Sequence, residues 1–117
     1  MNKRRIGSEN EERAASFLEG SGYRVIERNF YCRFGEIDLV AYDGEYLCFI
    51  EVKYRSGIDY GLPEEAVDQR KIKKISKCAF YYCYKNRLGT DRSIRFDVVS
   101  IEGEEIRLIK NAFEYCE

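Results

Sequence analysis

The sequence predicts a mixed α/β fold whose elements follow the order α-β-β-β-α-β-β, with a mixed central sheet flanked by helices. Two segments carry apolar residues at helical spacing, one over residues 7–20 and the other over residues 63–86. Two pairs of alternating segments rich in β-branched residues each enclose a glycine-containing turn, at residues 43–44 and at residues 102–103. A further alternating segment, residues 22–30, follows a glycine break and supplies the first strand.

The composition indicates one globular domain over residues 1–117. The chain has 117 residues, of which 44% are hydrophobic, so it is long enough to bury a core. Its net charge is −1, so a nucleic-acid partner must be met by a local basic patch rather than by a global positive field. The sequence shows neither a membrane-length apolar run nor the apolar segment of a signal peptide. We therefore expect a cytoplasmic protein without a membrane partner.

The chemistry open to this chain is limited by its lack of histidine. Without histidine, Ser-His and Cys-His nucleophile systems and histidine-ligated zinc enzymes are excluded. Acid–base work then falls to Asp, Glu, Lys or Tyr. The five cysteines form an odd count without a C-x-x-C pair, which is typical of reduced, partly buried thiols.

The first predicted helix begins with a pattern that leaves two roles open for Glu11. Ser8 followed three residues later by Glu11 forms a capping box, with Ser8 as the N-cap. Glu11 also lies on one helical stripe with Ala14 and Leu18, which is expected to face the sheet. Glu11 therefore either caps the helix or directs an acid at the sheet.

The central hairpin, residues 36–42 and 46–53, gathers charged side chains on one face. Because side chains alternate along a strand, Asp38 shares a face with Glu51 and Lys53. A two-residue loop at the turn makes the two acids diagonal neighbours, and a four-residue loop places them directly opposite each other. A slip of one residue would instead separate them.

These charges admit two interpretations, because two carboxylates and an ammonium on an apolar face cost desolvation energy unless they pair or bind. One interpretation is a cross-strand salt bridge between Lys53 and an acid at a half-exposed sheet edge. The other is a divalent-metal site formed by Asp38 and Glu51, with Lys53 beside it.

The second predicted helix starts at Pro63, which suits a first helical turn. Lys71 lies within its apolar stripe, where it either snorkels to the rim or extends towards the carboxylates or a phosphate. Arg70 and Lys74 belong to the outer face, in a stretch that contains six basic residues and no acid between residues 70 and 85. This face is either simply solvated or contacts a nucleic-acid backbone. The stripe comprises Val67, Ile75, Cys78, Ala79 and Tyr82.

Three arginines outside the helices have competing roles. Arg33, between the first two strands, is either a solvated loop charge or a phosphate contact. Arg55, just after the third strand, either pairs with an acid or clamps a phosphate with its guanidinium. In the second hairpin, Arg95 and Asp97 share a face and are expected to pair.

The hairpin motif resembles the PD-(D/E)XK nuclease superfamily, in which an Asp precedes a short hairpin and a Glu-x-Lys follows on the next strand. Ile37-Asp38 matches the first element and Glu51-Val52-Lys53 the second, with Ile37 in place of the proline. The blocks GEIDL, FIEVKYR and RFDVV, in this order, resemble the YraN family, which is related to archaeal Holliday-junction resolvases. The similarity extends from Gly7 to Phe113, with Asn10 in place of the usual glycine before the helical Glu.

The resemblance implies a restriction-endonuclease-like core and a nuclease dependent on Mg²⁺ or Mn²⁺ that acts on DNA, including branched or recombining DNA. It implies that Lys53 positions or deprotonates the attacking water, and it leaves a homodimer open. A non-catalytic nucleic-acid-binding module and a protein-interaction domain that docks through the tyrosine-rich helix remain the alternatives. The implied metal ligands are Asp38, Glu51, the Val52 carbonyl and Glu11, and the expected nucleic-acid contacts are Arg33, Arg55, Arg70, Lys71 and Lys74.

Overall fold

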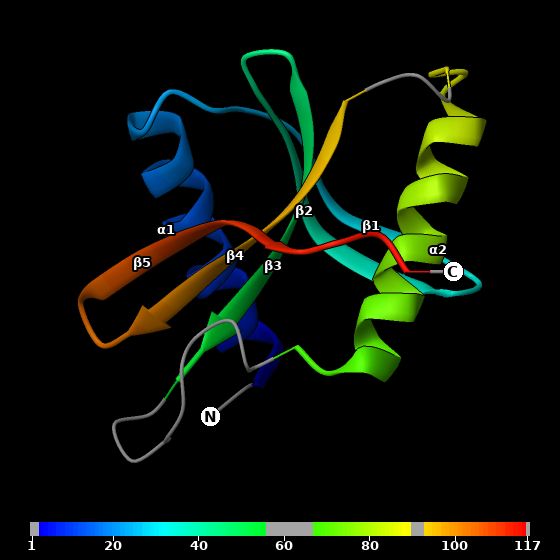
Figure 1. Cartoon of the computed structure of the whole chain (residues 1–117). Coiled ribbons are helices and arrows are strands. Elements are labelled where there is room, and N and C mark those ends of the chain that lie inside the picture. Colours follow the sequence, from blue (N-terminus) through cyan, green and yellow to red (C-terminus); the bar gives the residue numbers. More distant parts are fainter. Residues whose placement is uncertain (1–2, 56–66, 90–92, 117) are drawn as a thin grey trace.

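The structure is a computed structural model that describes residues 3–55, 67–89 and 93–116. Its helices and strands follow the predicted order α-β-β-β-α-β-β, which confirms the fold class (Figure 1). None of the helices in these ranges is long and apolar enough to cross a membrane. The elements are α1 (Lys3–Gly20), β1 (Arg24–Cys32), β2 (Gly35–Asp43), β3 (Tyr46–Tyr54), α2 (Gln69–Lys85), β4 (Ile94–Glu102) and β5 (Glu105–Phe113).

The described strands form one five-stranded sheet in the order β1-β2-β3-β4-β5. All neighbouring pairs are antiparallel except β3 and β4, which are parallel. A parallel pair needs a crossover connection, and the chain between β3 and β4 includes α2. The sheet is therefore mixed, as predicted.

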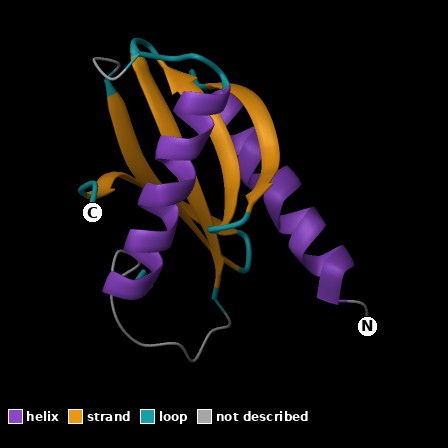
Figure 2. Cartoon of the chain, turned by 90° about the vertical axis from the view of Figure 1, so that its right-hand side faces the viewer, coloured by secondary structure: helices purple, strands orange, loops and turns teal. Residues whose placement is uncertain are grey.

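The two helices cover opposite faces of the sheet (Figures 1 and 2). Ala14 and Leu18 of α1 are fully buried in a cluster with Ile50 of β3. Cys78 of α2 is fully buried in a second cluster, which contains Phe49. Consecutive residues of β3 thus point to different helices, as the period of a strand requires.

The β1–β2 hairpin changes the face to which its side chains point at Asn29 and Asp38. In β2, Leu39 packs in the hydrophobic cluster under α1, which we call the α1 cluster. Ile37, two residues earlier, packs in the cluster under α2, which we call the α2 cluster. A regular strand would place both on one face. Asn29 has a φ of 54°, a left-handed conformation that asparagine tolerates better than most residues. Beyond this switch Phe30 joins the α2 cluster, so the end of the hairpin wraps towards α2.

Both hairpin turns lie one residue later than predicted. The first turn is Gly44-Glu45, because Asp43 remains in the strand and pairs with Tyr46. Asp43 stays there since its carboxylate accepts hydrogen bonds from Arg95 at 2.7 Å and Lys110 at 3.2 Å.

The second hairpin turns at Gly103-Glu104 instead of the predicted residues 102–103, with Glu102 paired to Glu105. Gly44 and Gly103 both have a φ of 60°, which glycine adopts without steric cost. In each case the glycine therefore occupies the first position of the turn.

The predicted starts of both helices are wrong. Helix α1 begins at Lys3, so Ser8 lies inside it and cannot be its N-cap. A single glycine costs a helix only about 1 kcal/mol, too little to stop it at Gly7.

Helix α2 begins at Gln69, because Asp68 is its N-cap and accepts a hydrogen bond from the Lys71 amide at 2.9 Å. Pro63 and the two glutamates after it lie outside the described residues. The buried stripe from Ile75 to Tyr82 is confirmed.

Candidate functional site

Asp38 and Glu51 meet where β2 and β3 separate. The pairing of these strands runs from Asp43–Tyr46 to Leu39–Ile50, and continuing this register puts Asp38 opposite Glu51. At this point Asp38 Oδ2 accepts a hydrogen bond from the Val52 amide at 2.8 Å. This register gives the two acids the directly opposed relation predicted for a four-residue loop, although the loop itself has two residues.

Two lysines accompany the acids. Glu51 is 7% exposed, and its Oε1 forms an ion pair with the Lys71 ammonium. The Lys53 Nζ lies 3.8 Å from the same oxygen. Lys71 therefore extends to the carboxylates and does not simply snorkel to the rim. We call Asp38, Glu51, Lys53 and Lys71 the carboxylate–lysine cluster.

The electrostatics of this cluster are unbalanced. Burial, the charge of Glu51 and the weaker charges of Glu36 and Glu11 raise the pKa of Asp38 to about 8, although the Val52 amide opposes the shift. The ionised form of Asp38 is therefore disfavoured by burial and by the neighbouring acids, even with the two lysines of the cluster nearby. Such a shift, caused by burial together with a like charge, is typical of functional sites.

The two lysines are driven apart in their proton affinity. Burial, followed by the neighbouring Lys71 ammonium, lowers the pKa of Lys53. Burial also opposes the charge of Lys71, but the hydrogen bonds to Glu51 and Lys53 outweigh it and raise its pKa. Lys53 is thus the lysine that releases its proton more easily, and Lys71 is the lysine that stays positive.

Glu11 and Val52 occupy less direct positions than the resemblance implies. Glu11 is half-buried on α1, and of the causes that raise the pKa of Asp38 its charge is the weakest. Val52 contacts Asp38 through its amide. Over the described ranges, no three side chains of His, Cys, Asp or Glu are grouped closely enough to hold a metal ion.

The donor set nevertheless fits one hard divalent cation held by Asp38 and Glu51. Magnesium is commonly bound by one or two carboxylates, with water and substrate phosphate completing its coordination. The buried Glu51 and the half-buried Asp38 supply carboxylate oxygens of this kind, and a bound cation would favour the ionised form of Asp38. In the structure Lys71 offsets the charge of Glu51, the role that a cation would otherwise fill.

The other expected nucleic-acid contacts are spread over the molecule. Arg70 and Lys74 are exposed on α2, away from the buried stripe. Arg55 follows β3, and its amide donates to the Ile101 carbonyl at 2.8 Å. Arg33 lies in the turn between β1 and β2, where its guanidinium stacks over the Phe34 ring. Of the five predicted contacts, only Lys71 joins the carboxylates.

Asp68, which places Lys71, is not among the residues predicted from the sequence. Asp68 caps α2 and binds the Lys71 amide, which sets the orientation of the first helical turn. An Asp immediately before an apolar helical pattern is a recognisable N-cap signal. The prediction of a helix start at Pro63 concealed it.

Another ionic cluster was only partly predicted. It is formed by Asp97, Arg95, Tyr23 and Asp43, and we call it the Asp97 network. The expected Arg95–Asp97 pair is confirmed, with Arg95 Nε donating to Asp97 Oδ1 at 2.9 Å. The Tyr23 hydroxyl donates to Asp97 Oδ2 at 2.8 Å, a contact that the sequence analysis missed. Tyr23 belongs to the α1 cluster, so these charges lie on the face opposite to α2.

Comparison with known proteins identifies close relatives over nearly the whole chain. Residues 10–101 match a family described as "Uncharacterised protein family UPF0102". A UPF0102 protein of Lachnoclostridium phytofermentans is 49% identical over 114 residues, which cover 97% of each chain. One from Persephonella marina is 44% identical over 108 residues and 92% of each chain. Another, from Fusobacterium nucleatum, is 45% identical over 95% of this chain and 92% of its own.

Proposed function

The chain belongs to the UPF0102 family, which is the YraN family, and from this premise we propose that it is a divalent-metal-dependent nuclease acting on DNA. The observation that carries the proposal is the carboxylate–lysine cluster. A half-buried Asp38 with a raised pKa beside the buried Glu51 and two lysines is an expensive arrangement, which a purely structural ion pair does not need. A cytoplasmic location is part of this proposal.

Each side chain of the cluster has a distinct task in this function. Asp38 and Glu51 would hold Mg²⁺ or Mn²⁺, which when bound supplies charge neutralisation at the scissile phosphate and a more acidic water. Lys53, whose pKa is lowered, orients the attacking water and takes a proton at Nζ. Lys71 stays charged and, when it leaves Glu51, is free to bind a phosphate oxygen of the substrate.

The test is a cleavage screen with Mg²⁺ and Mn²⁺ on linear, flapped and four-way DNA. We expect cleavage by the wild type and a loss of at least about 100-fold in Glu51→Gln, because one buried ligand of the ion is neutralised. The matched control is Glu45→Gln, which neutralises an exposed glutamate in the first turn and should cleave normally. A wild type that cleaves none of these substrates with any divalent ion would refute the proposal.

The Glu51–Lys71 ion pair also favours a second candidate, a nucleic-acid-binding module that does not cleave. This pair offsets the charge of Glu51 without a metal. Titration calorimetry with Mn²⁺ separates the two functions. Metal binding that strengthens in Lys71→Met supports the nuclease, because the competing ammonium is gone. Salt-sensitive DNA binding by a protein with no measurable Mn²⁺ affinity supports the module.

A further inference from the structure

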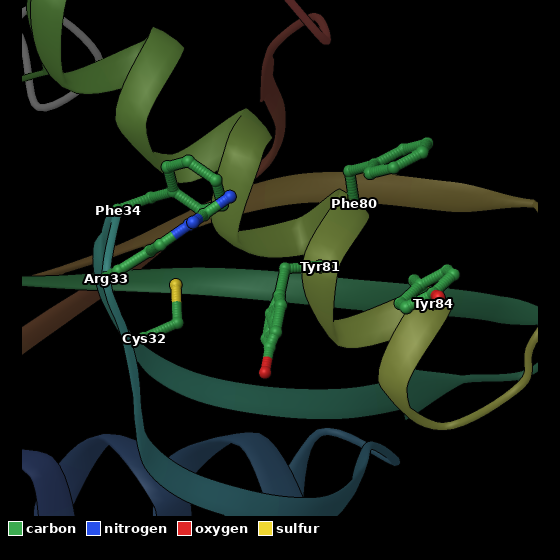
Figure 3. A pocket seen from close by; sticks show the side chains of 6 residues that line it. All are labelled: Cys32, Arg33, Phe34, Phe80, Tyr81 and Tyr84. Carbon is green, nitrogen blue, oxygen red and sulfur yellow. The ribbon is translucent and has the colours of Figure 1, made fainter.

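A cavity of about 490 Å³ lies between the β1–β2 connection and the C-terminal part of α2 (Figure 3). Its volume is within the range of about 300–1,000 Å³ that is common for small-ligand pockets. In Figure 3, Arg33 and Phe34 face Tyr81 and Tyr84 across the opening. The lining residues are Cys32, Arg33, Phe34, Phe80, Tyr81 and Tyr84.

The lining combines exposed aromatic rings with positive charge. Phe80 and Tyr84 are 59% and 78% exposed, and as residues four apart they present their rings on one side of α2. The Arg33 guanidinium lies 4.9 Å from the centre of the Phe34 ring, and the Lys77 ammonium lies 5.9 Å from the same ring. None of the lining side chains is acidic.

This chemistry fits an unpaired nucleobase and its phosphate better than it fits an apolar partner. Aromatic side chains stack on the flat face of any base, and a guanidinium binds phosphate through two parallel hydrogen bonds. An apolar partner would have to bury the Arg33 and Lys77 charges without compensation. The surrounding helix adds charge complementarity, because α2 carries six basic residues and no acid over residues 70–85.

The same helix connects this cavity to the carboxylate–lysine cluster. Lys71 stands in the first turn of α2 and Tyr84 in the last. At about 1.5 Å per residue, this stretch of helix spans about 20 Å. A strand with the spacing of B-form DNA, about 3.4 Å per nucleotide, covers that distance with about six nucleotides. One strand can therefore reach both places while it follows the basic face of α2.

We propose that this cavity binds an unpaired base of single-stranded DNA, so that the substrate carries a single-stranded segment several nucleotides from the cleaved bond. The inference that the strand is a substrate rests on the proposed nuclease function. The binding of a base in the cavity does not depend on that function. The recognition is independent of sequence, because stacking uses the ring face common to all bases.

The test measures DNA binding without metal, so that it does not depend on cleavage. A single-stranded oligonucleotide containing 2-aminopurine is titrated in EDTA, in parallel with a blunt duplex of the same length. We expect quenching of 2-aminopurine by the wild type, and in Tyr84→Ala a loss of single-strand affinity of about tenfold, since one stacked ring is removed. Tyr84→Phe keeps the ring and should bind normally, and blunt-duplex affinity should not change in either variant.

Two controls make the outcome specific. Tyr115→Ala removes a tyrosine that is 43% exposed outside the cavity lining, and it should leave binding unchanged. Arg33→Gln should weaken single-strand binding and reduce its dependence on salt, whereas Arg33→Lys should retain the salt dependence.

Three results would overturn the inference. These are equal losses for single strand and duplex in Tyr84→Ala, unchanged single-strand binding in that variant, and a wild-type dimer that the substitution dissociates. The last would assign the cavity to a second copy of the chain. Normal base binding by a wild type that never cleaves would refute the nuclease alone.

Discussion

Two ionic clusters among the described residues lie on opposite faces of the sheet, and they differ in how well their carboxylates are stabilised. On the α1 face, Asp97 is 0% exposed and accepts hydrogen bonds from Tyr23, Arg95 and the Asn111 amide. On the α2 face, Asp38 receives a hydrogen bond from the Val52 amide, and the charge of the nearby Glu51 raises its pKa. Asp97 is thus held by several hydrogen bonds within its own network, whereas Asp38 accepts one from the Val52 amide and its charge is opposed by burial and a neighbouring acid.

The pKa shifts express the same difference. In the Asp97 network, the hydrogen bond from Arg95 lowers the pKa of Asp43, which means that the folded state favours the charge of Asp43. In the carboxylate–lysine cluster, burial raises the pKa of Asp38, so the folded state opposes the charge of Asp38. A carboxylate whose charge is stabilised supports the fold, whereas one whose charge is opposed is suited to bind a cation or move a proton.

The largest effect on stability is expected from Arg95→Met. This substitution leaves Asp97 buried without its main partner, and removal of one member of a buried pair costs about 3–5 kcal/mol. The free energy of unfolding in urea measures it. The control is Arg28→Met, which breaks the exposed ion pair with Glu12 and should cost less than about 1 kcal/mol. Equal losses in the two variants would show that the Asp97 network does not hold the fold together.

A substitution in the carboxylate–lysine cluster should lower the cleavage activity rather than the stability. Lys53→Gln is expected to lower the cleavage rate by about 100-fold or more, the usual contribution of a positioned acid–base group. Its stability should stay within about 1 kcal/mol of the wild type, because Lys53 is a partly exposed and distant partner of Glu51. The matched control, Lys110→Gln, removes a lysine that pairs with Asp43 of the Asp97 network, and this variant should cleave normally. A stability loss in Lys53→Gln with cleavage retained would make the cluster structural.

The smallest effect is a difference in pH dependence that has opposite signs in the two clusters. The pKa of Asp38 is about 8 in the folded state against an ordinary value of 3.8, so the folded state binds the extra proton between these values. Its contribution to stability is then lost as the pH rises through this window in metal-free protein. Asp38→Asn should remove the loss and stabilise the protein at pH 7 by about 1–3 kcal/mol. Urea unfolding in EDTA at several pH values measures it.

Asp43→Asn provides the opposite case. The lowered pKa of Asp43 contributes stability that is present above its unfolded pKa and is lost as the pH falls through the folded value. The variant should therefore be less stable than the wild type at pH 7 and should converge with it in acid. Parallel pH profiles for the two Asn variants would contradict the contrast between the clusters.

Local patterns were sufficient for the order of elements and for the shared face of Asp38 and Glu51. The helical stripes and strand alternation depend only on spacing, so Leu18, Ile75 and Cys78 are buried as predicted. The helix starts and hairpin turns were wrong. The N-cap of α2 is a local signal at Asp68 that was passed over, whereas the first turn depends on a side chain with distant partners. Asp43 is retained in its strand by Arg95, more than fifty positions away in sequence, and no local pattern contains that contact.

The sequence by itself therefore determined that Asp38, Glu51 and Lys53 gather on one side of the hairpin, because the period of a strand places them there. Only the tertiary structure decided which charges are stabilised and which are opposed. The crossover brings Lys71 of α2 onto Glu51, and the switch of faces at Asn29 and Asp38 separates the strands where the acids meet. The physical reason is that burial and long-range partners, which appear only when the elements pack, set the energy of a charge.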